Sequence, residues 1–223
     1  MSESVGVRSQ LGILSENTLS GNNPATGAPW AGGDTYRFAF LSSTNTYATS
    51  ADISTYNTFV QNLADNSTNY NIGADNDVIW KVIGSTGVVD ARDNTLTNTN
   101  LNGTGESVFL LDGSTLIAKD YADLWDGNIL HIINQTEEGV EKVHWPFTGS
   151  YWDGTKAPGH DTSFGALGDV VPGTEIHQGR SDVTNEWIWR AWTGDPANTK
   201  LPVYALTDPL VIEASIGTQI LLR

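Results

Sequence analysis

The chain has 223 residues, with 11 Lys and Arg against 26 Asp and Glu, so its formal net charge is −15. Nucleic acids and anionic membranes bind clustered cations, so this balance predicts no nucleic-acid partner and no membrane insertion. The absence of cysteine excludes disulfides, thiolate metal sites and a cysteine nucleophile. A low fraction of charged residues together with 23 glycines is typical of a loop-rich β protein that faces the outside of a cell or particle.

The first half of the chain predicts an arm, a strand and a helix. Turn-forming residues dominate Ser20–Pro29, so we expect residues 1–29 to form an N-terminal arm and loop. Apolar and aromatic residues alternate in Thr35–Leu41, which predicts a strand. The apolar period changes to three and four within Thr49–Asp65, which predicts an amphipathic helix capped by Ser50 or Asp52.

The second half predicts short strands separated by long loops. We expect a strand at Val78–Gly84 and a hairpin at Ser107–Ile117, with its turn at Asp112-Gly113. Apolar or alternating aromatic runs also predict strands at Asn128–Asn134, Glu186–Trp192 and Pro202–Ile212, the last broken by Pro209. The main domain thus covers 30–213, and 214–223 form a closing strand or an arm that docks on another subunit.

Six blocks in this order resemble an uncharacterised domain of exported bacterial proteins, often those with PEP-CTERM sorting tails. The resemblance covers about 30–212. The blocks are Gly33–Phe40, Ala51–Val60, Trp80–Thr86, Val89–Thr95, Phe109–Gly113 and Ala122–Gly127.

The middle of the chain, with Phe147–Gly154, also resembles the endostatin-like branch of the C-type-lectin-like fold. This second resemblance implies a compact fold whose N- and C-terminal strands pair, with Val5–Leu14 near Val211–Leu222. The expected class is therefore α+β and C-type-lectin-like, with one main amphipathic helix, short antiparallel strands and long loops. The Glu-Pro-Asn and Trp-Asn-Asp ligands of calcium-dependent lectins are absent, so the resemblance implies a scaffold and carries over no sugar site.

Acidic loops offer the candidate metal ligands. Asp120, Asp123 and Asp126 cluster within a short stretch, and Asp75 and Asp77 form a second pair. Hard cations take such oxygen ligands from loops, so calcium is the candidate ion, and no other cofactor is predicted. Solvated acidic loops are the alternative interpretation. Asp90 and Arg92 predict a structural ion pair, in which Arg92 clamps a loop through bidentate carboxylate contacts.

Tryptophan is the most informative residue type, because the chain contains eight copies. Tryptophan binds sugar rings and protein partners, and it also builds cores in loop-rich domains that lack disulfides. On a strand, Trp187 and Trp189 share one face. The candidate partner-binding residues are Trp30, Trp145, Trp152, Trp187 and Trp189.

These observations favour a protein without catalytic residues that works outside a cell. Residues Met1–Arg8 show no basic region followed by an apolar stretch, so we expect no secretory signal. The composition thus indicates a place outside the cell, whereas no export signal is expected. A virion protein accounts for both observations, because it is made inside a cell and later exposed outside it. The leading hypothesis is therefore a non-enzymatic virion surface protein, a phage capsid decoration or fibre component. Its partners would be the capsid, other virion proteins or copies of itself, with host-surface or glycan binding.

Two alternatives remain open at the level of sequence. The first is a secreted bacterial surface or matrix protein that binds glycans or self-assembles. The second is a hydrolase that uses loop carboxylates across a cleft.

Overall fold

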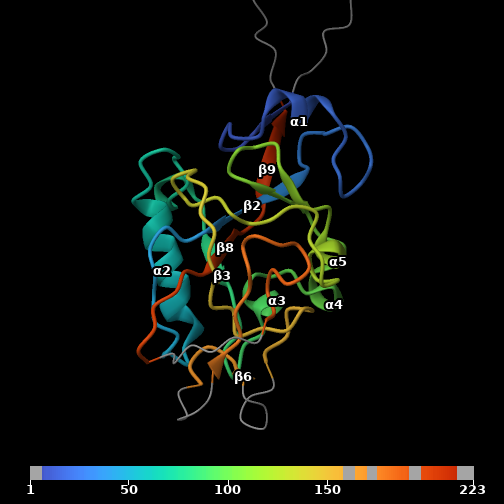
Figure 1. Ribbon diagram of the computed structural model, residues 1–223. Helices are drawn as coiled ribbons and strands as arrows, with labels where there is room; N and C mark the ends of the chain where they lie inside the picture. Colours follow the sequence, from blue (N-terminus) through green and yellow to red (C-terminus); the bar gives the residue numbers. More distant parts are fainter. Residues whose placement is uncertain (1–6, 158–163, 170–174, 191–196, 215–223) are drawn as a thin grey trace, which may run out of the picture.

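The computed structural model describes residues 7–157, 164–169, 175–190 and 197–214, which form a mixed α and β structure around an open sheet (Figure 1). The elements in chain order are β1 (Val7–Ser9), α1 (Glu16–Ser20), β2 (Thr35–Leu41), α2 (Ile53–Asp65), η1 (Ala74–Asn76), β3 (Trp80–Ile83), α3 (Ala91–Asn94), α4 (Thr99–Asn102), β4 (Ser107–Leu110), β5 (Leu116–Ala118), α5 (Tyr121–Leu124), β6 (Phe164–Gly165), β7 (Glu175–Ile176), β8 (Tyr204–Thr207) and β9 (Leu210–Ala214). The α+β expectation is thereby confirmed.

Strand β2 lies at the centre of the larger sheet. One of its edges pairs with β4, which pairs in turn with β5. Its other edge pairs with β9 near Thr35 and with β8 near Leu41, because the strand is interrupted at Pro209, between β8 and β9. The outer edge of β9 carries β1, and the outer edge of β8 carries β3. The predicted hairpin and the predicted break at Pro209 are both confirmed.

The expectation of antiparallel strands alone is wrong, because β2 and β4 are parallel, as are β6 and β7. Parallel strands cannot be joined by a tight turn and need a long crossover connection. Between β2 and β4 the chain forms α2, β3, α3 and α4, which supply that crossover. The alternation of apolar residues along a strand does not reveal which direction its neighbour runs.

Both faces of the sheet are buried. Along β2, Phe38 and Phe40 belong to one core cluster, and Ala39 and Leu41 belong to the other. Helix α2 covers the first face, where it buries Tyr56, Val60 and Ala64 (Figure 1). The second face is covered by α3, α5 and the loops that contain Trp125 and Trp187. From Tyr36 to Leu41 every residue of β2 is buried, which fits a strand that is covered on both sides.

Helix α2 begins and ends close to the predicted limits. Asp52 is its N-cap, and the carboxylate of this residue accepts the backbone N–H of Ser54 at 2.9 Å. This contact satisfies one of the donors that the first turn of a helix leaves free. Within the described residues, four further α-helices of four or five residues, α1 and α3–α5, lie between the loops. The sequence pattern does not predict them.

The first and last described strands pair with each other. Val7 lies opposite Ala214, and Ser9 lies opposite Ile212, in an antiparallel ladder. The expected pairing of the two ends is confirmed for these residues, whereas 1–6 and 215–223, and with them most of the predicted C-terminal strand or arm, lie outside the described part. The C-type-lectin-like fold itself stays a prediction.

The apolar runs at 128–134 and 186–190 do not form strands. In the first run, Ile129 donates its N–H to the carbonyl of Thr184, while Leu130 donates to Ile117. Single bonds to two separate partners replace a ladder, which leaves Ile129 and Ile133 buried and His131 exposed. The apolar residues of this run are therefore anchors of a loop.

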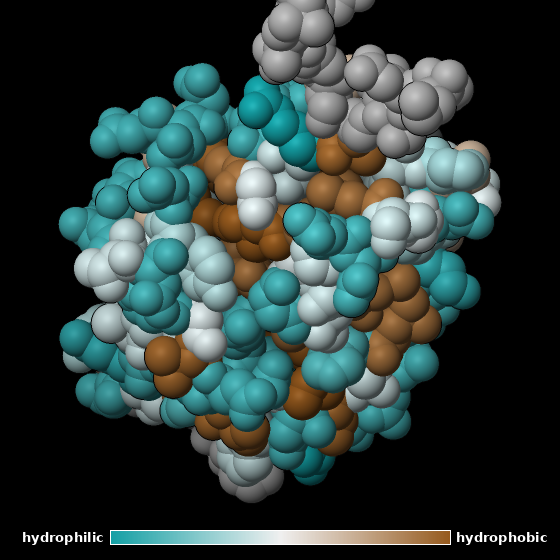
Figure 2. Space-filling view, turned by 90° about the horizontal axis from the view of Figure 1, so that it is seen from above, coloured by the Kyte–Doolittle hydropathy of each residue, from teal (hydrophilic) through white to brown (hydrophobic). Residues whose placement is uncertain are grey.

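None of the helices in the described ranges combines the length and the apolar character that crossing a membrane requires. The face seen from above is mostly hydrophilic, and its hydrophobic residues form several separate areas (Figure 2).

Candidate functional site

The candidate tryptophans divide into buried and exposed members. Trp30 is 6% exposed and Trp187 is 0% exposed, so neither can contact a partner at the surface of this structure. Trp152 is 46% exposed and Trp189 is 39% exposed, and Trp145 is intermediate. The expectation that Trp30 lies at the surface is therefore wrong, and Trp187 and Trp189 do not share a strand face.

Local contacts explain the two buried indoles. The Nε1 of Trp30 donates to the carbonyl of Thr18 at 3.0 Å, which draws the indole onto the core beside Phe109. Trp187 packs between Trp125 and Tyr204, with ring centroids 5.8 and 5.9 Å away. Turn residues next to Trp30 in the sequence do not reveal that its side chain points inward.

Trp152 borders a hollow of about 270 Å³ that four segments of the chain build together, one of them α4 with Thr99. Helix α3 supplies Arg92, and α5 with its C-cap supplies an aromatic wall. The loop after Phe147 supplies Trp152 and Asp153. The lining residues are Arg92, Thr99, Tyr121, Ala122, Trp125, Trp152 and Asp153. Within this hollow, aromatic rings lie beside one cation and one carboxylate.

A repeated tripeptide forms two of these walls. Trp125-Asp126-Gly127 and Trp152-Asp153-Gly154 have the same three residues, and each glycine lies against the indole of the other copy. A Cβ on Gly154 would lie 2.7 Å from the Trp125 ring, and a Cβ on Gly127 would lie 3.6 Å from Trp152. Both glycines have positive φ, +74° and +94°, which L side chains rarely adopt.

The aspartates of the two tripeptides act alike as well. Asp126 accepts the N–H of Asn128 at 2.9 Å, and Asp153 accepts the N–H of Thr155 at 3.1 Å. These turns fix the loops that hold the two indoles. The repeated Trp-Asp-Gly is the one signal in the sequence that indicates this pair, and helix and strand periodicity does not reveal it.

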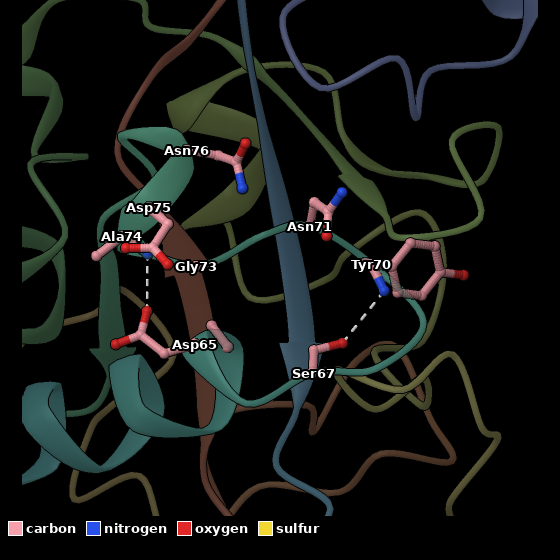
Figure 3. A pocket seen from close by; sticks show the side chains of 9 residues that line it. Asp65, Ser67, Tyr70, Asn71, Gly73, Ala74, Asp75 and Asn76 are labelled. Carbon is pink, nitrogen blue, oxygen red and sulfur yellow. Dashed lines mark hydrogen bonds between the residues drawn. The ribbon is translucent and has the colours of Figure 1, made fainter.

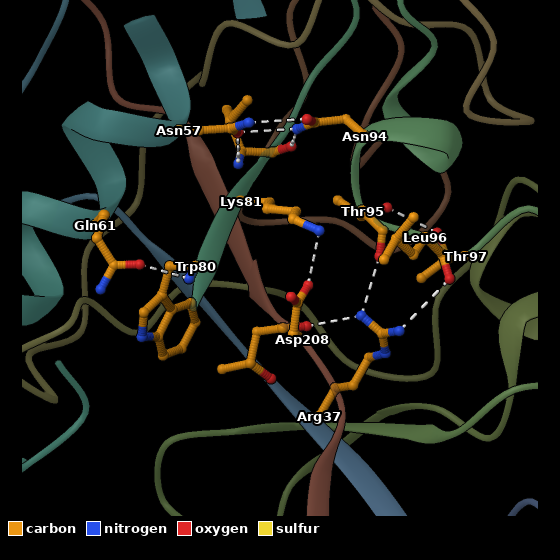
Figure 4. A network of polar contacts seen from close by, with 12 residues as sticks. Arg37, Asn57, Gln61, Trp80, Lys81, Asn94, Thr95, Leu96, Thr97 and Asp208 are labelled. Carbon is orange, nitrogen blue, oxygen red and sulfur yellow. Dashed lines mark hydrogen bonds and ion pairs between the residues drawn. The ribbon is translucent and has the colours of Figure 1, made fainter. Parts of the chain in front are cut away.

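The wall behind the hollow rests on a buried charge, Arg37, which is 1% exposed (Figure 4). Its Nη1 donates to the carbonyls of Thr95 at 3.0 Å and Thr207 at 2.7 Å. Its Nη2 donates to the Tyr121 hydroxyl at 2.5 Å, and its Nε forms a 2.8 Å ion pair with Glu106. The arginine therefore joins the sheet to the wall of the hollow.

The same network places both aromatic groups of that wall. Burial raises the pKa of the Tyr121 hydroxyl well above its ordinary value, although the Arg37 cation opposes the shift. The hydroxyl therefore stays protonated, and it donates to Glu106. The Nε1 of Trp125 donates to Thr97 at 2.9 Å, in the segment that the Arg37 contact to Thr95 holds. Tyr121 and Trp125 are thus fixed before any ligand arrives.

Arg92 does not make the predicted bidentate clamp. Its Nη2 lies 3.9 Å from Asp90 Oδ2, which is an ion pair but too far for a hydrogen bond. One oxygen of Asp90 instead accepts the backbone N–H of Lys156 at 2.9 Å. The buried Nε of Arg92 has no hydrogen-bond partner among the described residues. The described residues therefore satisfy this guanidinium only in part.

The three candidate metal ligands serve the loop around α5. Asp120 caps the helix by accepting the N–H of Asp123 at 2.9 Å, and Asp123 accepts the N–H of Lys119 at 2.8 Å. Asp126 forms the turn described above. No group of three or more His, Cys, Asp or Glu residues converges within the described ranges. Calcium binding at these aspartates stays a prediction.

A second hollow, of about 190 Å³, lies between the end of α2 and η1, near the predicted pair Asp75 and Asp77 (Figure 3). Asp75 lines it, and Asp77 adopts the left-handed conformation that ends η1. Asp65 faces the same space and accepts the N–H of Ala74 at 2.7 Å. Asp65 and Asp75 are the two acids that line the space, and Tyr70 is its one aromatic lining residue.

A scan against protein-family models and a search of curated proteins both find no match for this chain. The interpretation of the site therefore depends on its own geometry.

Proposed function

We propose that this chain is a non-enzymatic surface protein that binds a carbohydrate in the hollow beside Trp152. The observation that carries the proposal is an exposed indole, fixed by its own loop and by Gly127, next to Arg92 and Asp153. A sugar ring presents an apolar face of C–H groups and an edge of hydroxyls, which need a flat aromatic surface and hydrogen-bonding groups respectively.

The size of the hollow supports a small ligand. Sites for drug-sized ligands begin at roughly 300 Å³, so about 270 Å³ suits one or two sugar rings. The ligand would add to a site whose side chains are already held, which lowers the entropic cost of binding. Thr99 at the start of α4 offers a further hydroxyl at the rim.

The composition of the hollow favours binding over hydrolysis. Glycoside hydrolysis uses a pair of carboxyl groups that flank the scissile bond. Among the residues that line this hollow, Asp153 is the one carboxylate, and its Oδ1 already accepts two hydrogen bonds from Thr155. That is why we propose a binding module.

We propose the surface of a virus particle as the setting, with the chain as a phage capsid decoration or fibre component. The net charge of −15 supports this setting, because acidic surfaces repel one another and so keep exposed proteins and their particles soluble. The pairing of β1 with β9 also supports it, because attachment at that end leaves α3–α5 free (Figure 1). A secreted bacterial surface or matrix protein with the same glycan site, or one that self-assembles, is the alternative.

A glycan array probed with labelled wild-type protein and with Trp152→Ala tests the binding function. We expect a defined set of glycans to bind the wild type and to lose at least about tenfold in affinity with Trp152→Ala. A nucleobase stacked on an aromatic side chain gains roughly 1–3 kcal/mol, and we take the same order for a sugar ring on this indole. Trp189→Ala, which removes a second indole that is exposed among the described residues, is the control and should bind as the wild type does. Equal binding by all three proteins, or by none, would contradict the proposal.

The setting has its own test. Mass spectrometry of purified virus particles from the source should find this chain in fixed ratio to the capsid protein. Its presence in the cell-surface fraction alone would favour the bacterial alternative, and the glycan site would be unaffected by that outcome.

A further inference from the structure

The guanidinium of Arg92 lacks a proper acceptor. It forms no hydrogen bond within the described residues, and its closest carboxylate oxygen, on Asp90, is 3.9 Å away. A buried donor without an acceptor lowers the stability of the folded state, and a charged donor lowers it more than a neutral one does. Nε is the buried atom of this guanidinium, whereas the side chain as a whole is 26% exposed and lines the hollow.

The nearby acids are partly occupied by other donors of the chain. One oxygen of Asp90 accepts from Lys156, and one oxygen of Asp93 accepts the side-chain amide of Asn98 at 2.6 Å. Asp153 holds Thr155 with Oδ1, which leaves Oδ2 available at the hollow. Arg92 is the one cation among the lining residues, so it is the group that can attract an anion there.

We infer that the sugar bound at Trp152 bears a carboxylate, as a uronic or sialic acid does, and that Arg92 holds this carboxylate. The inference rests on the proposed function and adds the ligand class. The planar fork of arginine matches a carboxylate with two parallel hydrogen bonds. Trp152 lies against the ring, and the free oxygen of Asp153 accepts a ring hydroxyl.

The overall negative charge does not prevent this contact. At physiological ionic strength the Debye length is about 8 Å, so distant carboxylates of the chain are largely screened. The contact with Arg92 is local and partly desolvated, where screening is weak. The net charge of −15 therefore slows association more than it weakens the bound state.

Isothermal titration of the wild-type protein with paired ligands tests the inference. The probes are galacturonate, glucuronate and N-acetylneuraminate oligosaccharides, each with its methyl ester, which keeps the ring and removes the charge. We expect at least one acid to bind about tenfold or more tightly than its ester, because a hydrogen bond to a charged group is worth more than a neutral one.

Three variants assign the effect to its residues. Arg92→Gln should bring the ratio of acid to ester affinity to about 1, and Arg92→Lys should leave an intermediate ratio, because it keeps the charge and loses the fork. Arg8→Gln removes the same charge from an exposed pair with Glu213, far along the chain from the hollow, and should keep the wild-type ratio. Trp152→Ala should weaken acid and ester alike.

The outcomes separate the inference from the function beneath it. If esters bind the wild type as tightly as acids and Trp152→Ala weakens both, the carboxylate inference fails and carbohydrate binding stands. If no acid, ester or neutral sugar binds, or if binding ignores Trp152→Ala, both fail. The comparison of acid with ester in the wild type decides the inference even if an Arg92 variant does not fold.

Discussion

Replacing Arg37 with methionine should lower the free energy of unfolding by about 5 kcal/mol. Removal of one partner from a buried ion pair costs roughly 3–5 kcal/mol, and the 18% exposure of Glu106 places this pair near the lower end of that range. The carbonyls of Thr95 and Thr207 also lose their bonds to Nη1. Each of these buried acceptors adds about 1 kcal/mol.

Urea unfolding followed by tryptophan fluorescence measures this loss, with an unchanged slope as evidence that the folded state remains compact. Because domains of this kind have about 5–15 kcal/mol in total, the variant should stay folded but weak. Adding Glu106→Gln to Arg37→Met should recover about 1–2 kcal/mol, since it removes the charge that lost its partner. Arg8→Met, in the exposed pair with Glu213, is the control and should cost less than about 1 kcal/mol. A loss below about 1 kcal/mol for Arg37→Met would refute the view that this network holds the hollow to the sheet.

Two further substitutions test single features. Gly154→Ala should destabilise the fold by about 2 kcal/mol more than Gly103→Ala does. The two glycines have similar φ, +74° and +73°, but only a Cβ at residue 154 would clash with the Trp125 ring. Equal losses of stability in thermal melts would contradict the packing of the two tripeptides. Burial lowers the pKa of His177 to about 4. Below about pH 6.5 the imidazole is therefore protonated in the unfolded chain but stays neutral in the folded chain. The free energy of unfolding should therefore fall between about pH 6.5 and pH 4, by at most about 3 kcal/mol, and His177→Gln should flatten that fall in urea unfolding curves; the same fall in the variant would assign it to another group.

Local patterns were enough to predict several elements. The alternation in Thr35–Leu41, the helical period up to Asp65 and the Asp112-Gly113 turn are properties of neighbouring residues, and the structure confirms each. The Asp112 turn shows the reason, because its carboxylate accepts the N–H groups of Ser114 and Thr115, both at 2.8 Å. Such contacts form within a few residues and leave a signature in the sequence.

The remaining features depend on contacts between distant segments. The parallel pairing of β2 with β4 depends on the whole crossover between them, and the burial of Trp30 depends on Phe109 and on the carbonyl of Thr18. The hollow beside Trp152 needs α3, α5 and the later loop to meet. Of its residues, the sequence predicted Trp152 as a binding residue and Arg92 as half of an ion pair, and it did not bring them together.

The side-chain N–H of Trp152 offers the most direct test of the site. In a ¹⁵N-resolved spectrum, with this signal assigned from Trp152→Phe, addition of a carbohydrate selected on the glycan array should shift the indole signals of Trp152 and Trp125. The signal of Trp30, which is buried far from the hollow in the other core cluster, should stay in place. A shift at Trp189 with none at Trp152 would contradict the assignment of the binding site to this hollow.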